Sequence, residues 1–193
     1  MATVARRVGA ENSATRAAIL AAAEAQMREE GYGAVSTRKV AARAGLKPSL
    51  VHYYFPTTED LLMALFRMGA DQSDAMIDAA LASPDPLPAL WAFLADPSRN
   101  RLALEFMALA NHRKDIQQEI ADHSERMRAR QVKALRRLFG DQLAAQGIPA
   151  AGLTLVLAGI GRALVMEGGL GVTGGHEEAR RWVEDWVARL GAA

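Results

Sequence analysis

Apolar residues recur along this chain at three- and four-residue intervals, and short breaks rich in glycine and proline separate the periodic segments. This spacing places apolar side chains on one face of a helix, whereas the alternation typical of a half-buried strand is nearly absent. The pattern therefore predicts an all-α fold of about nine helices. We expect these helices within residues 15–30, 36–44, 48–55, 57–82, 87–96, 99–112, 114–146, 150–168 and 176–190.

The most informative segment covers residues 36–55, with the sequence STRKVAARAGLKPSLVHYYF. Ser36 can accept an amide hydrogen bond at the start of a helix, and Gly45 can adopt the left-handed conformation that ends one. Pro48 then suits a first helical position, because it lacks the amide hydrogen that would be left unpaired there. Two short helices across a tight turn predict a helix-turn-helix, whose second helix can enter the major groove of DNA.

The second of these helices carries polar side chains on its outer side. Lys47 offers a charge for phosphate or guanine, and Tyr53 is long enough to reach the wall of a groove. Arg38 and Lys39 begin the preceding helix, where free amide hydrogens favour an anion. The same residues also fit a basic, solvated helix pair, so the surrounding sequence decides between the two interpretations. The outer side consists of Lys47, Ser49, His52 and Tyr53.

The whole run from residue 15 to residue 61 resembles the DNA-binding domain of the TetR family of transcriptional repressors. The matching features, in order, are EEGY from Glu29, STRKVAARAGL from Ser36, and HYYF from His52 followed by EDL. The resemblance implies an all-helical homodimer. It also implies an N-terminal three-helix DNA-binding helix-turn-helix domain, here 1–56, and a C-terminal helical ligand-binding and dimerisation domain, here 57–193. In that family a small molecule binds the C-terminal domain and releases the protein from its operator.

Positions that match the family's DNA contacts can be carried over one by one, and four departures accompany them. Lys47 stands where a serine cap is usual, and Thr58 stands where a basic residue is usual. Lys39 replaces a common acidic residue, and Gln26 occupies a usually apolar position. The resemblance places the DNA contacts on Ser36, Thr37, Arg38, Lys47, Ser49, Leu50, His52, Tyr53 and Thr58.

Charge is distributed unevenly along the 193 residues, although the net charge is only +1. Residues 1–55 hold eight Lys or Arg against four Glu, a balance of +4, and the remainder of the chain has a balance of −3. This asymmetry fits a nucleic-acid-binding module joined to a neutral or acidic one. Arg6, Arg7 and Arg16 are candidates for an arm beside the DNA, although exposed tails are often only solvating.

Several other classes of protein find no support in the sequence. Cysteine is absent, which excludes disulfides and thiolate metal sites and is compatible with the cytoplasm. No nucleophile elbow, Walker A motif or dinucleotide fingerprint occurs, and the four histidines lack metal-ligand spacing. The apolar stretch 153–166 is interrupted by Arg162, which argues against a membrane span. We expect a cytoplasmic protein without catalytic residues, metal or cofactor.

The last two predicted helices carry many apolar residues, including Trp182 and Trp186. Exposed together, they would form a large apolar patch of the kind that marks an interface. We expect two such helices from each chain to form a four-helix bundle in the homodimer, with Gly159 and Gly161 allowing close approach. The alternative is an intramolecular core. The predicted interface comprises Leu157, Ile160, Leu164, Trp182, Val183, Trp186 and Leu190.

A pocket for a small-molecule effector is predicted among the helices between residues 87 and 166. Aromatic and methionine side chains suit an adaptable apolar pocket, and a histidine and an arginine can orient an oxygen-bearing ligand. Because no charged cluster stands out there, we expect a largely apolar effector. The alternative is a ligand-independent dimerisation scaffold with a filled core. The candidate residues are Trp91, Phe106, Met107, His123, Met127, Arg162 and Met166.

Overall fold

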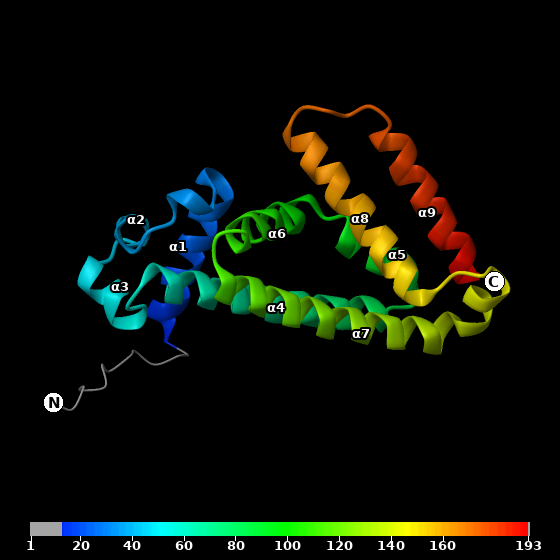
Figure 1. Cartoon of the computed structure of the whole chain (residues 1–193), viewed down its shortest axis with the longest axis horizontal. Helices are drawn as coiled ribbons and strands as arrows, with labels where there is room; N and C mark the ends of the chain where they lie inside the picture. The colour runs from blue at the N-terminus through cyan, green and yellow to red at the C-terminus, as the bar shows by residue number, and fades with distance from the viewer. Residues whose placement is uncertain (1–12, 193) are drawn as a thin grey trace. The chain divides into compact units, whose positions relative to one another are not determined.

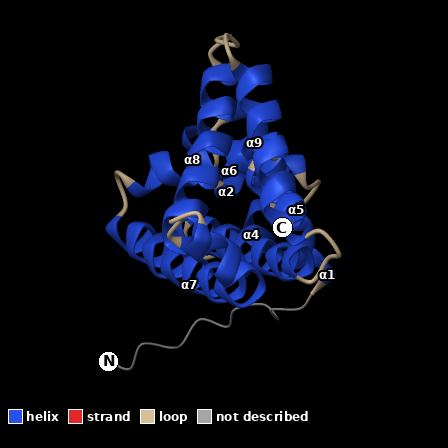
Figure 2. Cartoon of the chain, turned by 90° about the vertical axis from the view of Figure 1, so that its right-hand side faces the viewer, coloured by secondary structure: helices blue, strands red, loops and turns tan. Residues whose placement is uncertain are grey.

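A computed structural model describes residues 13–192 and contains helices and connections, without a strand in that range (Figures 1 and 2). The predicted all-α fold is confirmed, and each expected helix lies close to its predicted position. The described helices are α1 (Ala14–Glu30), α2 (Thr37–Arg43), α3 (Pro48–Tyr54), α4 (Thr58–Leu81), α5 (Pro86–Leu94), α6 (Pro97–Ala110), α7 (Lys114–Ala145), α8 (Ala150–Gly169) and α9 (His176–Ala192), with a 3-10 turn η1 (Tyr32–Ala34).

The chain forms two compact units, one extending to Ala70 and the other beginning at Asp71. The division falls inside α4, later than the domain boundary expected at residues 56 and 57. Leu61 and Leu65, near the start of α4, have no exposed surface. Burying both side chains is worth several kcal/mol, at about 1.5–3 kcal/mol for each, which fixes the beginning of α4 within the N-terminal unit.

Local hydrogen bonds explain where the helices of the N-terminal unit begin. Ser36 Oγ accepts from the amide of Lys39 at 3.3 Å, as the predicted N-cap requires. The Asp60 amide donates to Thr57 Oγ1 at 3.0 Å, and the Thr57 amide donates to Asp60 Oδ2 at 3.0 Å. This reciprocal pair is a capping box, so the predicted start of α4 is confirmed.

The turn between α2 and α3 depends on Gly45, whose φ of +67° lies in the left-handed region. The amide of Gly45 donates to the carbonyl of Ala42 at 3.2 Å, and the amide of Leu46 donates to that of Ala41 at 2.9 Å. These bonds pair carbonyls that the end of α2 would otherwise leave free. The turn therefore ends α2 and directs the chain into α3.

Gln26 occupies a buried position on α1 with only 3% of its surface exposed. Its Nε2 donates to the carbonyl oxygen of Ala34 at 3.2 Å. The amide therefore connects α1 to the end of η1, a link that an apolar residue could not make. This contact gives the unusual polar residue a structural role.

The core of the second unit lies among α5, α8, α9 and the last turns of α7. Trp91 packs in this cluster with Leu135, Leu157 and Val187, all of them almost fully buried. The backbone of α7 leaves helical geometry at Phe139, with φ −134° and ψ 21°, and the buried Phe139 side chain joins the same cluster. The last part of α7 therefore belongs to the core formed with α8 and α9.

Most residues predicted to face a partner chain lie instead in this intramolecular core, so that part of the interface prediction is wrong. Leu157, Val183 and Leu190 have at most 1% of their surface exposed, and Leu164 is also buried. Ile160 and Trp186 pack partly buried against the same cluster. The spacing of these residues could not distinguish the two cases, because a helix face buried in a core and one buried in an interface show the same apolar periodicity. Of the seven predicted interface residues, Trp182 alone is exposed.

Gly161 allows α8 to approach the end of α5. A Cβ atom at this position would lie 2.2 Å from the carbonyl oxygen of Leu94, which no packed structure tolerates. The same carbonyl accepts from Asn100 Nδ2 at 2.7 Å. The predicted close approach of helices at Gly161 is confirmed, and it joins α8 to the end of α5 within one chain.

Helix α8 is long and apolar enough, by length and composition alone, to cross a membrane. The core helix of a folded domain meets the same criterion. Leu153, Leu157 and Leu164 of α8 pack in the core described above, and Arg162 interrupts its apolar sequence. We therefore interpret α8 as a core helix.

Gly161→Ala is expected to destabilise the second unit, because the added methyl group must displace the Leu94 carbonyl. Overpacking of this kind costs about 1–3 kcal/mol. Gly69→Ala in α4 is the matched control, since its Cβ would meet nothing within 4 Å. Urea unfolding followed by circular dichroism checks the difference. Equal stability of the two variants would contradict the close approach.

Candidate nucleic-acid interface

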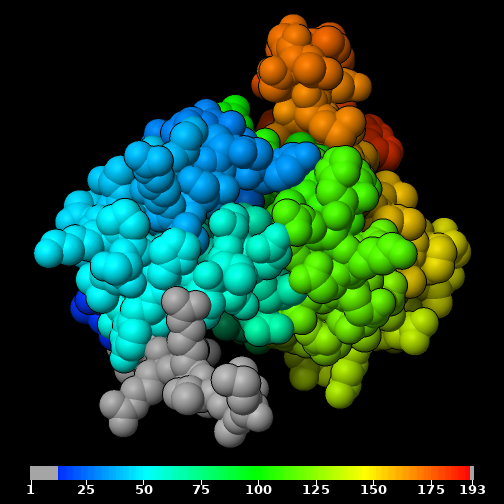
Figure 3. All heavy atoms as spheres, turned by 60° about the vertical axis from the view of Figure 1, so that its left-hand side comes forward, coloured from blue at the N-terminus to red at the C-terminus, as the bar shows by residue number. Residues whose placement is uncertain are grey.

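Helix α3 has one buried and one exposed side. Val51 has no exposed surface and anchors α3 in the N-terminal unit, where α3 packs against α2. Tyr53 is 45% exposed and Leu50 is 36% exposed on the other side. The exposed side also carries Lys47, Ser49 and His52, and the residues of α2 and α3 lie among the blue and cyan atoms of Figure 3.

The four basic residues of the helix-turn-helix fall into two pairs. Lys39 Nζ lies 3.1 Å from a carboxylate oxygen of Glu30, and Arg43 binds Glu29. The Arg43 guanidinium lowers the pKa of the Glu29 carboxyl through their hydrogen bond. Arg38 and Lys47 are exposed and make no ion pair within the described part of the chain. The free positive charge of this motif therefore lies at the beginning of α2 and at the beginning of α3.

Thr37 and His52 connect the two helices. Thr37 is only 7% exposed, and its Oγ1 lies 3.4 Å from His52 Nε2. His52 Nδ1 lies 3.3 Å from the carbonyl oxygen of Pro56, so in the neutral ring Nδ1 donates and Nε2 accepts from Thr37. Thr37 was predicted to contact DNA, but its burial gives it a positioning role behind His52.

The remaining predicted contacts have different exposures. Ser36 is partly buried and uses its hydroxyl as the cap of α2. Thr58 is partly buried as the first residue of α4. The guanidinium of Arg16 lies 5.2 Å from the centre of the Phe55 ring, so Arg16 packs on the domain and does not belong to a free arm. Arg6 and Arg7 lie outside the described residues.

The predicted effector residues separate into three groups in the second unit. Trp91 is part of the core with α8 and α9. Met107 is 48% exposed and Met166 is 54% exposed, so within one chain they lie on the surface. A buried or partly buried group remains on α6, α7 and α8, which pack against one another in pairs. This group consists of Phe106, His123, Met127 and Arg162.

Burial changes the ionisation of two residues in this last group. Burial lowers the pKa of His123, while the Asp74 carboxylate opposes the change. Burial therefore favours the neutral form of the His123 ring. Burial also lowers the pKa of Arg162, and the positive charge of Arg128 lowers it further. Arg128 was not predicted, because a long and densely charged helix gives no sequence signal for which charges turn inward.

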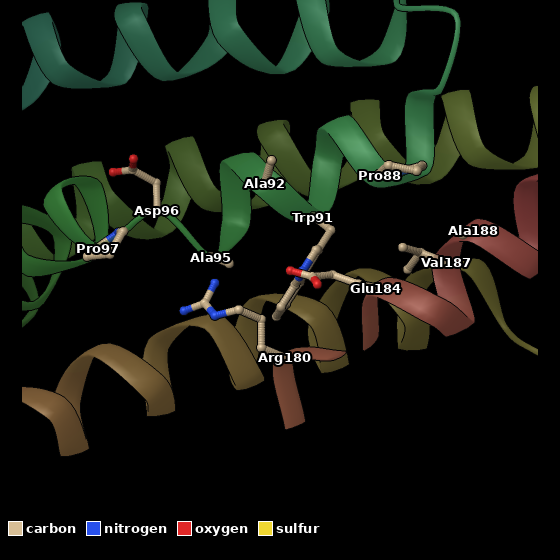
Figure 4. A pocket seen from close by; sticks show the side chains of 10 residues that line it. All are labelled: Pro88, Trp91, Ala92, Ala95, Asp96, Pro97, Arg180, Glu184, Val187 and Ala188. Carbon is tan, nitrogen blue, oxygen red and sulfur yellow. The ribbon is translucent and has the colours of Figure 1, made fainter. Parts of the chain in front are cut away.

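A separate hollow of about 420 Å³ lies between α5, the start of α6 and α9 (Figure 4). Arg180 and Glu184 reach into it from α9, and Asp96 lies at the start of α6. Asp96 is already engaged as a helix cap, accepting from the amide of Arg99 at 2.7 Å. Of the predicted effector residues, Trp91 alone lines this hollow. Its mixture of both charges and small apolar groups defines no single ligand chemistry.

An exposed polar helix held across a glycine turn from a capped helix defines a helix-turn-helix of the type found in transcriptional regulators. Residues 19–65 match the family described as bacterial regulatory proteins, tetR family. This match covers the helix-turn-helix segment and supports a TetR-family transcriptional regulator.

Relatives and solved structures agree with this assignment. The HTH-type transcriptional regulator BetI of Rhizobium meliloti is 30% identical over 132 residues, which cover 64% of this chain and 65% of BetI. The crystal structure of SCO7518 from Streptomyces coelicolor has a TM-score of 0.68 at 23% identity, covering 94% of this chain and all of that one. A protein from Saccharomonospora viridis in complex with choline has a TM-score of 0.73 at 19% identity, covering 90% of this chain and 95% of that one.

Lys47→Ser is expected to stabilise the N-terminal unit. Lys47 has the extended backbone of an N-cap, with φ −72° and ψ 138°, but makes no capping hydrogen bond through its side chain. A serine hydroxyl there can accept a hydrogen bond from an amide in the first turn of α3, which is worth about 1 kcal/mol. Thermal unfolding measures the gain, and Lys47→Ala is the control that removes the charge without adding a cap. If alanine stabilised as much as serine, capping would not be the cause.

Proposed function

We propose that this protein is a homodimeric repressor that binds a palindromic DNA operator and is released by a small-molecule effector. The observation that carries the proposal is the exposed side of α3. It presents the Tyr53 side chain and the positive charge of Lys47, which makes no ion pair within the described residues. A regulator of this kind acts on DNA, and we place it in the cytoplasm for that reason.

The charge arrangement supports a role in binding phosphate. Lys39 and Arg43 are neutralised by carboxylates of α1, whereas Arg38 and Lys47 keep their charge available. Cations that release counterions from the DNA backbone supply much of the binding free energy. His52 and Tyr53 then offer groups for base edges in the major groove. The buried Thr37 supports this surface, because its contact with His52 Nε2 fixes the orientation of the ring.

A different surface supports the dimer. The outer side of α8 and α9 exposes apolar residues, and Trp182 is 56% exposed while stacking on Trp186 with ring centres 5.6 Å apart. Contiguous apolar surface of this kind marks an interaction site in soluble domains. We propose that two α8–α9 pairs meet as a four-helix bundle through this outer side, not through the buried seam. Its exposed apolar residues are Leu155, Val156, Met166 and Trp182.

Dimerisation would set the spacing of two DNA-binding units. Two recognition helices about 34–36 Å apart can read one operator with two-fold symmetry. An effector that binds better to a dimer with another spacing would shift the population away from DNA. A tenfold loss of operator affinity needs a coupling free energy of only about 1.4 kcal/mol. The Saccharomonospora viridis protein with choline supports the idea that this fold accepts a small ligand.

A ligand-independent dimerisation scaffold is the second candidate for the C-terminal unit. The packing of Trp91 among buried side chains of α7, α8 and α9 favours it. The partly buried polar group on α6, α7 and α8 favours the effector-binding alternative. Stabilisation of the purified protein by a small molecule would distinguish the two.

Lys47→Ala and Tyr53→Ala are expected to weaken operator binding, each by tenfold or more, without changing the fold. Operator fragments would be selected from genomic DNA and affinities measured by fluorescence anisotropy. If Lys47 contacts a phosphate, Lys47→Ala should also make the plot of log binding constant against log salt concentration less steep, by about 0.9 in slope. Lys39→Ala is the matched control. It also removes one positive charge from the helix-turn-helix, but the charge of Lys39 is already paired with Glu30.

The expected order is therefore a large effect at Lys47 and Tyr53 and a small one at Lys39. Unchanged affinity in both test variants would remove α3 from the DNA interface. An equally large loss of affinity in Lys39→Ala would contradict the proposal. Operator affinity would then depend on the total positive charge of the motif, whether or not a cation is paired.

Trp182→Glu is expected to convert the dimer into monomers, because it places a charge in the proposed apolar interface. Light scattering coupled to gel filtration at micromolar concentration should then give the mass of one 20.8 kDa chain. Met107→Glu is the matched control, since Met107 is comparably exposed on α6 but outside the α8–α9 surface. A Trp182→Glu protein that stays dimeric would refute the proposed interface.

A further inference from the structure

Two arginines on neighbouring helices of the second unit lack a carboxylate partner. Arg128 of α7 and Arg162 of α8 are both partly buried, and α7 and α8 pack against each other. Neither makes an ion pair in the described range of the chain. Arg128 is close enough for its charge to act on Arg162. Two like charges brought together away from full solvation are unfavourable unless an anion joins them.

Arg130, two residues further along α7, provides a comparison, because its charge is neutralised by carboxylates of the protein itself. Its guanidinium lies 2.6 Å from Asp74 Oδ2 and 2.5 Å from Asp78 Oδ1. Both carboxylates raise the pKa of Arg130, whereas burial and Arg128 lower that of Arg162. Helix α4 therefore supplies carboxylates to Arg130, whereas Arg128 and Arg162 make no ion pair in the described range of the chain.

Gln131 adds a third unused donor to the same side of α7. It follows Arg128 by three residues, a spacing that places both on one helical face. Gln131 is only 3% exposed, and its Nε2 has no hydrogen-bond partner. A buried amide donor without a partner is unfavourable, because it has lost its hydrogen bonds to water. Gln131 and Arg162 lie at nearly equal chain distances from Gly147, on either side of the connection between α7 and α8.

Helix α6 supplies apolar surface next to these donors. It packs against both α7 and α8, and its Leu102, Phe106 and Leu109 are buried. Met127 lies beside Arg128 on α7 and is partly buried. A ligand between these helices would therefore meet positive donors at one end and apolar side chains around them.

We infer that Arg128, Gln131 and Arg162 form the head-group site for a carboxylate whose remaining body is apolar, such as a fatty or aromatic monocarboxylic acid. Guanidinium groups bind carboxylates through paired, charge-assisted hydrogen bonds, and the anion would neutralise the like charges of the two arginines. This inference rests on the proposed function, because it names the chemical class of the proposed effector. It refines the expected largely apolar effector by adding one anionic group.

The test measures binding to the full-length protein by thermal unfolding and isothermal titration calorimetry. The probes are octanoate and benzoate, with octanamide and benzamide as neutral analogues of the same shape, and inorganic phosphate as an anion without an apolar body. We expect the two acids to stabilise the protein saturably and the amides and phosphate not to do so. Arg128→Met and Arg162→Met should each weaken acid binding at least tenfold. Arg137→Gln, an exposed arginine of the same helix, should leave it unchanged.

The ligand-free variants provide a second measurement. Methionine keeps the length of the side chain and removes the unpaired charge, so Arg162→Met should raise the melting temperature of the ligand-free protein. A lower melting temperature, the same acid affinity in all variants, or no response to either acid would overturn the inference. A response to phosphate equal to that of the acids would overturn the assignment to an organic acid.

Operator binding is measured separately, so that the two proposals can fail independently. If the protein binds DNA and neither acid stabilises it, the inference fails and the proposed repressor remains. If the acids bind through Arg128 and Arg162 but no genomic fragment is bound, the site stands and the proposed repressor fails.

Discussion

The burial of Val51 is the interaction on which the proposed DNA-binding surface depends. This side chain has no exposed surface, and removing it from water is worth about 1.5–3 kcal/mol. It fixes the rotation of α3 about its own axis, so that Lys47 and Tyr53 must point outward. Gly45 sets the direction in which α3 leaves the turn, and the Thr37–His52 contact holds the ring of one exposed residue. An apolar anchor thus determines where the polar groups stand.

The N-terminal unit could be predicted in detail because its signals are local. The cap at Ser36 and the left-handed Gly45 each depend on residues within one turn, and both occur as predicted. The capping box at Thr57 is equally local. Helix positions along the second unit were also predictable from periodicity. In contrast, the sequence could not indicate which apolar stripe faces the core. Leu157 and Val183 have the spacing of an interface, yet three-dimensional packing buries them within one chain.

Charge pairing in the second unit was equally beyond the sequence. Helix α7 carries a run of basic residues with no local mark to distinguish them, and the partners of Arg130 come from α4, far away in the chain. Arg162 was a candidate from its position in an apolar helix, but Arg128 and Gln131 became visible only through their neighbours. Long-range contacts therefore decide which charges are solvated, which are paired and which remain available to a ligand.

The break at Phe139 has a consequence for how the longest helix behaves. The non-helical backbone at Phe139 lets the two parts of α7 open separately, so amide protons just after Phe139 should exchange with solvent sooner than those around Leu135. The part before Phe139 carries Arg128 and Arg130, whereas the part after it is embedded among α5, α8 and α9. The two parts of α7 can therefore move independently, so a displacement of one part need not displace the other.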